Sequence, residues 1–294
     1  MTSTHIEHPE DLILTGDMSV FNLLYDKAFI SMKMDGMSLV WGTNPANGKF
    51  FVCTKAAFNK KKVRLCYNHD DIFNHFGHQI EVVDILSHCL KYLPRTENIY
   101  WGDWLGFGRT DVLTQNTLTY AFPDAIDQKL VIAPHTIVNV YAEFCDGVCE
   151  PLTDTLEDTK MVKWVQPSVD RVPPEQNAPK INTTNINFLT KKQAESAKVA
   201  INQLIRRGDY IDDATLTEIL GCVQLANLYQ LVMEIKLDIM DSLIINDAPL
   251  SYLPNGDLAP NGEGYVFHSE HYGSVKLVNR TEFAYANFNN GFGT

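Results

Sequence analysis

The sequence predicts an α+β fold in which an antiparallel β-sheet core carries an inserted helical bundle. Residues 29–144 hold short runs of β-branched and aromatic residues separated by turn signals, as strands do. Residues 190–247 instead repeat apolar residues at helical spacing. Strand chemistry returns in residues 262–278. Because two β-rich stretches flank the helical block, we expect the last strands to pack beside the first.

Residues 1–150 are interpreted as the N-terminal part of the core. Strands are expected at residues 29–32, 38–41 and 49–54, with turns at Asp35-Gly36 and at residues 44–48. Spaced apolar residues predict a helix within residues 77–93. Further strands are expected at residues 98–104 and 136–144.

The rest of the chain divides by composition. Residues 151–189 are rich in proline, asparagine and threonine and are interpreted as an extended connector. Residues 190–247 form the helical insertion, with a second helix starting near Asp212 and a third in residues 225–245. Residues 248–294 complete the core.

Composition limits the class of protein. The 294 residues are 45% hydrophobic and 11% aromatic, as in globular proteins. The chain has no apolar run of about 18 residues and no basic and apolar leader, so we expect a cytoplasmic protein without a membrane span. The six cysteines are scattered along the chain, which suits a reducing compartment. Cys145 and Cys149 could supply half of the four ligands of a zinc site, but we expect all six cysteines to be ordinary reduced thiols.

The net charge of −12 argues against a protein whose whole surface binds nucleic acid. A local basic groove is still compatible with this charge, and residues 55–64 (KAAFNKKKVR) are the candidate segment. The alternative interpretation of this segment is an ordinary solvated turn.

Four short motifs carry the chemistry. Lys33-Met34-Asp35-Gly36 follows the first predicted strand, and Asp103 interrupts the hydrophobic strand YWGDWLG. Further on, Glu263 precedes the apolar run GYVF, and Lys276 lies in the strand SVKLV. A carboxylate strand followed closely by a lysine strand forms a hairpin that can aim both groups at one point.

These motifs, in this order, resemble those of the covalent nucleotidyltransferases, which include ATP-dependent RNA ligases, DNA ligases and capping enzymes. KMDG is similar to motif I, with Ser38 closer to the RNA ligase version; YWGDWLG is similar to motif III, EGYVF to motif IV and SVKLV to motif V. Lys55 matches the basic residue of motif Ia, and Tyr141 the aromatic residue of motif IIIa. The chain departs from the family in carrying Asp103 for glutamate and one lysine in motif V, and no appended OB-fold is expected.

The resemblance implies a ligase-type adenylation core that forms a lysyl-AMP at Lys33 from ATP with Mg²⁺ or Mn²⁺. The AMP would pass to the 5′-phosphate of a polynucleotide end, RNA more than DNA, for strand sealing. The implied catalytic residues are Lys33, Asp35, Glu263 and Lys276. The implied metal ligands are Glu263 and Asp103. The implied nucleotide-binding residues are Ser31, Met32, Gly36, Ser38, Lys55, Asp103 and Tyr141.

Two alternatives stay open. The first is adenylylation of a protein or small molecule. The second is a catalytically inactive protein of the same fold that binds a nucleotide or nucleic acid. The segments HIEHPEDLI and KLVNRTEF also resemble an uncharacterised group of tailed-phage proteins, which would place the chain in a host cytoplasm.

Overall fold

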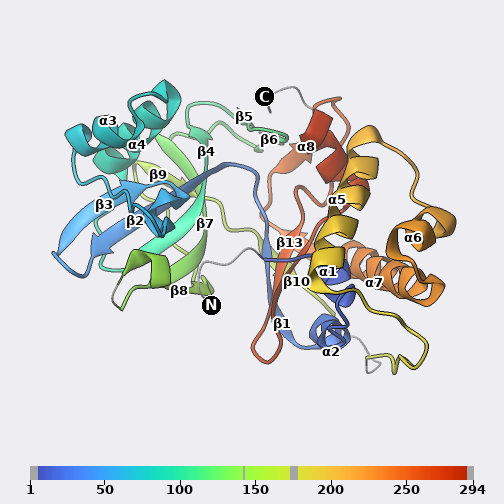
Figure 1. The fold of residues 1–294 in the computed structure, drawn as a ribbon. Helices are drawn as coiled ribbons and strands as arrows, with labels where there is room; N and C mark the ends of the chain where they lie inside the picture. Colours follow the sequence, from blue (N-terminus) through green and yellow to red (C-terminus); the bar gives the residue numbers. More distant parts are fainter. Residues whose placement is uncertain (1–5, 142, 173–177, 290–294) are drawn as a thin grey trace. The chain divides into compact units, whose positions relative to one another are not determined.

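The computed structural model describes residues 6–141, 143–172 and 178–289, which form two compact units (Figure 1). Unit 1 is built mainly from Met34–Gln166, with Asp247–Ser251 added. Unit 2 contains Ile6–Lys33, Pro167–Asn246 and Tyr252–Thr294. The chain therefore passes from unit 2 to unit 1 between Lys33 and Met34. Both units combine helices with antiparallel strands, so the predicted α+β class is confirmed.

Unit 1 is centred on a sheet of order β3-β2-β4-β7-β8, with β9 added parallel to β7. Its strands are β2 (Met37–Asn44), β3 (Lys49–Cys53), β4 (Ile99–Phe107), β7 (Leu130–Asn139), β8 (Val148–Pro151) and β9 (Val162–Trp164). A smaller sheet has the order β12-β6-β5 and contains β5 (Val112–Thr114), β6 (Thr119–Ala121) and β12 (Leu250–Tyr252).

The helices of unit 1 cover the main sheet and close its core. They are α3 (His69–Phe76) and α4 (Ile80–Tyr92), with the short 3₁₀ turns η1 (Lys55–Phe58) and η2 (Phe144–Asp146). In Figure 1, α3 and α4 lie beside β2 and β3. The predicted apolar stripe of α4 is buried at Ile85, Leu86, Cys89 and Leu90. Across the sheet, Trp41 stacks on Trp164 with ring centroids 5.6 Å apart.

Unit 2 contains a five-stranded sheet of order β11-β10-β1-β13-β14. Its strands are β1 (Ala28–Met32), β10 (Ser168–Asp170), β11 (Ile244–Asn246), β13 (Tyr265–Ser269) and β14 (Gly273–Leu277). The first strand pairs with β13 along its whole length, from Ala28↔Ser269 to Met32↔Tyr265. The prediction that the last strands pack beside the first is therefore confirmed.

Helices cover one side of this sheet (Figure 1). They are α1 (Pro9–Ile13), α2 (Ser19–Tyr25), α5 (Lys191–Arg207), α6 (Asp213–Leu220), α7 (Val223–Asp241) and α8 (Tyr285–Asn289), and the π-helical turn η3 (Arg280–Ala284) precedes α8. Helix α5 begins at a capping box in which Thr190 and Gln193 bond to each other's backbone N–H. Its buried face is Ala194, Ala197, Ile201 and Ile205, part of the predicted stripe. Both α1 and α7 pack against β14.

Some predicted elements differ from the structure. The strand predicted at residues 136–144 is displaced, because β7 spans Leu130–Asn139 and a 3₁₀ turn follows at Phe144. Pro134 lies within β7 opposite Gly102, next to a register shift, so the strand accepts a proline that ordinarily marks a strand's end. The predicted connector contains β9 and β10. Helices α1, α2 and α3 had not been predicted.

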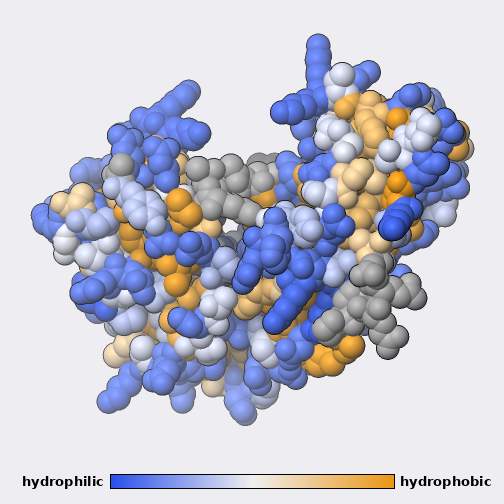
Figure 2. Space-filling view, turned by 90° about the horizontal axis from the view of Figure 1, so that it is seen from below, coloured by the Kyte–Doolittle hydropathy of each residue, from blue (hydrophilic) through white to orange (hydrophobic). Residues whose placement is uncertain are grey.

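On the face drawn in Figure 2, hydrophilic residues predominate and hydrophobic residues form separate patches among them. Such patches are ordinary on globular proteins. No described helix is long and apolar enough to cross a membrane.

Candidate functional site

One face of the unit 2 sheet is polar where β1, β13 and β14 lie side by side. Side chains alternate along each strand: Ile30 and Met32 are buried, whereas Ser31 is half-buried on the opposite face. Ser31 pairs with Val266, and Val266 pairs in turn with Lys276, so these three share one face. The opposite face packs into the core of unit 2. Lys33, two residues after Ser31, continues the polar face.

Lys33 and Glu263 form an ion pair on this face, although 230 residues separate them. Directly after β1, the backbone N–H of Lys33 donates to the carbonyl of Gly264 at 2.8 Å, which extends the pairing with β13 by one residue. Gly264 has φ +126°, and a Cβ there would overlap the backbone carbonyl of Leu277. Only glycine fits this backbone, and its conformation places Glu263 beside Lys33.

Lys276 lies on the same polar face and is half-buried. Burial lowers the pKa of Lys276, and the positive charge of Lys33 lowers it further, against the opposing effect of Glu7. The backbone N–H of Lys276 donates to the carbonyl of Glu7 at 3.0 Å. Two lysines and one carboxylate of unit 2, which the sequence predicted as site residues, are thus brought to one face.

A buried ionic network that was not predicted from the sequence lies close to Lys276. Lys236 on α7 is 1% exposed and its Nζ lies 2.6 Å from Glu10 Oε1 on α1. Arg280 Nη1 lies 3.1 Å from Asp11 Oδ1 and 3.5 Å from Glu10 Oε1. It also donates to the hydroxyl of Tyr229 at 3.2 Å. This network holds the N-terminal helix against α7 and against the segment that follows β14.

The network shifts the titration of its members. Burial alone would raise the pKa of Glu10, but the charges of Lys236 and Arg280 outweigh it and lower this pKa to about 2. Burial lowers the pKa of His8 to about 2, and Lys276 is among the cations that act in the same direction. On β13, burial lowers the pKa of His268 to about 4. Both histidines are therefore neutral at pH 7.

In unit 1, Asp35 organises the turn between β5 and β6. It is 8% exposed, and its Oδ2 accepts hydrogen bonds from the backbone N–H groups of Thr117 (2.7 Å) and Leu118 (3.0 Å). The backbone N–H of Asp35 donates to the hydroxyl of Tyr120 at 2.5 Å. The contacts seen for Asp35 therefore hold backbone in place.

Gly36 lets the chain pass close to β4. A Cβ at Gly36 would lie 2.7 Å from the carbonyl oxygen of Trp104 and 3.0 Å from Cβ of Asp103. Asp103 is the register partner of Ser38, whose hydroxyl accepts from the indole N–H of Trp101 at 2.8 Å. Gly36, Ser38 and Asp103 are therefore neighbours, as the resemblance implies.

His135 is a neighbour of Asp103 that the sequence analysis missed. Its Nε2 lies 3.6 Å from Asp103 Oδ2, and its ring lies 5.7 Å from that of Trp101. Nothing in the sequence near His135 distinguishes it, because its position depends on the irregular pairing of β4 with β7. The pair offers both a carboxylate and an imidazole.

Three other predicted nucleotide-binding residues differ in their exposure. The Met32 side chain is 7% exposed and packs in the core of unit 2, on the face opposite Lys33. Lys55 begins η1 with an exposed side chain, and Tyr141 follows the end of β7 with 83% of its surface exposed. Within the described residues, no hydrogen bond or ring contact joins Lys55 or Tyr141 to Ser38 or Asp103.

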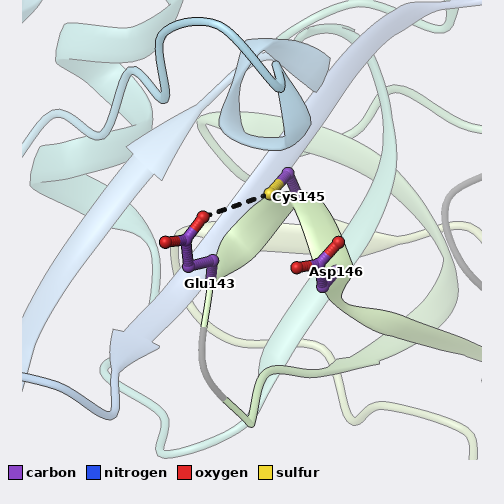
Figure 3. A group of neighbouring side chains, drawn as sticks. All are labelled: Glu143, Cys145 and Asp146. Carbon is purple, nitrogen blue, oxygen red and sulfur yellow. Dashed lines mark hydrogen bonds between the residues drawn. The ribbon is translucent and has the colours of Figure 1, made fainter.

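The six cysteines are free thiols. Cys145 lies beside Glu143 and Asp146 (Figure 3), with the ligand-type atoms of the three within 4.8 Å of one another. The Cys145 thiol donates to Glu143 Oε2 at 3.5 Å. Cys149 is on β8 and does not belong to this group. The group is largely exposed. Two carboxylates accompany Cys145 in it, whereas the sequence had suggested Cys149 as the partner of Cys145.

The chain belongs to a family of unknown function (DUF6267). The family model matches residues 3–220 and 189–291. No curated protein matches the chain. No solved structure matches it either.

Proposed function

We propose that the chain is an ATP-dependent nucleotidyltransferase of RNA-ligase type that forms a lysyl-AMP at Lys33. The proposal is carried by the convergence of Lys33, Glu263 and Lys276 on one face of the unit 2 sheet. The K-x-D-G, E-G and lysine-strand motifs, which the resemblance selected, supply all three residues.

Lys33 is the nucleophile in this proposal. Its Nζ attacks the α-phosphorus of ATP, the bond to the β-phosphate oxygen breaks, and pyrophosphate leaves. A lysine amine attacks only after losing a proton, and Glu263 Oε1 contacts Nζ, so it aims the amine and accepts that proton. Lys276 would offset negative charge that develops on the α-phosphate.

A divalent cation fits the donor set. Mg²⁺ ordinarily takes one or two carboxylates from a protein and completes its shell with phosphates and water. Glu263, on the polar face of the unit 2 sheet, offers such a carboxylate. When bound, the cation would supply charge neutralisation for the triphosphate.

Two further steps complete the proposed reaction. A 5′-phosphate oxygen of a polynucleotide attacks the lysyl-AMP, the P–N bond breaks, and Lys33 recovers its amine. A 3′-hydroxyl then attacks the 5′-phosphate, which releases AMP and seals the strand.

Intact-protein mass after incubation with ATP and Mg²⁺ tests the first step. The wild type should gain the mass of one AMP, and Lys33→Ala should gain none. Lys27→Ala is the matched control, because Lys27 precedes the same strand and is exposed. No adduct with ATP, GTP or NAD on folded wild-type protein would refute the covalent mechanism.

A nick-sealing assay with labelled RNA and DNA tests the acceptor. Sealing that depends on Lys33 supports the ligase reaction. A lysyl-AMP that forms without sealing either substrate would instead favour adenylylation of a protein or small molecule.

A further inference from the structure

One stretch of unit 1 has a charge opposite to that of the whole chain. Residues 36–69 contain six lysine or arginine residues and no aspartate or glutamate, in a chain of net charge −12. The six are Lys49, Lys55, Lys60, Lys61, Lys62 and Arg64. Four of them lie in a single loop after η1.

These cations face solvent without local compensation. All five lysines are exposed, and Arg64 is half-buried over the ring of Phe76 at 5.8 Å. None of the six forms an ion pair with a carboxylate in the described part of the chain. Their charge is therefore available to a partner.

Hydrogen bonds to the backbone restrain the loop that carries them. The side-chain oxygen of Asn59 accepts from the backbone N–H groups of Lys61 (2.9 Å) and Lys62 (3.1 Å). At the base of the loop, Val52 and Cys66 exchange two backbone hydrogen bonds of 3.1 Å. The lysines thus project from a fixed backbone, so that binding costs less conformational entropy than it would in a mobile tail.

We propose that this lysine loop, residues 55–64, binds the phosphate backbone of a nucleic acid, RNA or DNA. Clustered, uncompensated lysines neutralise phosphates and release counterions, which gives affinity without sequence specificity. The inference deepens the proposed function and rests on it only for the expectation that the chain meets a polynucleotide. It gives the substrate a docking surface in unit 1, whereas Lys33 belongs to unit 2.

An acidic membrane fits this surface less well. Helix α3 follows the loop and begins with Asp70 and Asp71, which add negative charge close to it in sequence. Within residues 55–64, Val63 is the exposed large apolar side chain, at 39%, so the loop has little to insert among lipids. A single-stranded nucleic acid is narrow enough to contact the lysines without contacting these aspartates.

Binding of a short labelled single-stranded oligonucleotide, followed by fluorescence anisotropy across a salt series, tests the proposal. RNA and DNA of the same sequence form the two arms. Lys61/Lys62→Ala is compared with the control Lys191/Lys192→Ala, since both remove two exposed neighbouring lysines and both lower the net charge by two from −12. Alanine keeps the N–H groups that Asn59 binds.

The wild type should lose roughly 50-fold in affinity between 50 and 200 mM salt if about four phosphates are neutralised. Lys61/Lys62→Ala should bind about tenfold or more weakly at 50 mM salt, with a salt slope smaller by about 1.4. The control should bind within about twofold of the wild type.

Equal weakening in both double variants would overturn the proposal, because net charge alone would then explain the binding. Absence of salt-dependent binding by the wild type would also overturn it, as would binding to phosphatidylserine vesicles in place of either oligonucleotide. Adenylylation of Lys33 is measured on the same proteins by mass and should persist in Lys61/Lys62→Ala. A failure of that chemistry is therefore distinct from a failure of the docking surface.

Discussion

Replacing Lys236 by methionine should destabilise unit 2 strongly. The side chains of Lys236 and Glu10 are 1% and 0% exposed, and their charged atoms lie 2.6 Å apart. Methionine fills a similar volume but leaves the carboxylate of Glu10 buried with Arg280 at 3.5 Å as its closest remaining cation. An ion left uncompensated in the interior costs far more than an exposed ion.

The magnitude follows from the titration of Glu10. Its pKa is lowered from 4.5 to about 2, which corresponds to roughly 3 kcal/mol in favour of the carboxylate form. Lys236 is the largest of the charges that lower it. We therefore expect Lys236→Met to lose about 3 kcal/mol at pH 7, within the range of about 3–5 kcal/mol for broken buried pairs.

Urea denaturation followed by tryptophan fluorescence and by far-UV circular dichroism shows which unit loses stability. All four tryptophans (Trp41, Trp101, Trp104 and Trp164) lie in unit 1, whereas most helical residues lie in unit 2. The variant should lower the urea midpoint seen by far-UV circular dichroism by about 1–2 M, for a denaturant slope of about 2 kcal/mol/M.

Two further variants make the test decisive. Arg207→Met removes a pair of similar length in the same unit, 2.7 Å to Asp209, whose side chains are 60% and 45% exposed, and it should cost less than about 1 kcal/mol. The double variant Glu10→Gln/Lys236→Met should recover much of the loss, because no unpaired charge remains. A loss of less than about 1 kcal/mol in Lys236→Met, or a double variant no more stable than Lys236→Met, would refute the reasoning.

Three other perturbations follow from the structure. The pKa values of His8 (about 2) and His268 (about 4) lie below the usual 6.5, so the unfolded chain binds more protons than the folded chain as the pH falls below 6.5. The free energy of unfolding should therefore fall by about 3 kcal/mol per histidine from pH 6.5 to 4. Equal urea midpoints at pH 7 and 4.5 would contradict this. Gly264→Ala should lower stability by at least about 2 kcal/mol and abolish the lysyl-AMP adduct. In the control Gly48→Ala, the added Cβ meets no atom within 4 Å, so the variant should lose about 1 kcal/mol and still form the adduct. Urea denaturation measures the stability, and intact-protein mass measures the adduct. Asp35→Ala removes the acceptor of two buried backbone N–H groups and should cost about 2–3 kcal/mol, so the urea midpoint seen by tryptophan fluorescence should fall by about 1–1.5 M; an unchanged midpoint would argue against its structural role.

The parts of the fold that sequence predicted are those with strong local periodicity. The apolar spacing of α4 and α5 and the turn at residues 44–48 depend on near neighbours alone. Helices α1 and α2 have only 5 and 7 residues, too few for a periodic pattern. Helix α3 has an N-cap, Asn68, but only Ile72 and Phe76 are buried, which gives a weak stripe.

Residues brought together by strand pairing were harder to predict. Lys33 and Glu263 were both identified through the motif order, since they are 230 positions apart and no local signal links them. His135 was missed because a register shift between β4 and β7 sets its position. The network of Glu10 with Lys236 was missed because the packing of helices α1 and α7 buries it. A single sequence contains neither kind of information.

Three residues of the K-M-D-G motif have different tasks, although they lie within four positions of one another. Lys33 ends a stretch of unit 2 and bears the amine that pairs with Glu263, whereas Asp35 and Gly36 belong to unit 1. There, Asp35 holds a turn through two backbone N–H groups, and Gly36 makes room for β4. A substitution at Asp35 that abolished adenylylation would therefore not by itself make it a catalytic residue. Lys33→Ala separates the two roles, because it should remove the adduct without moving the tryptophan transition of unit 1.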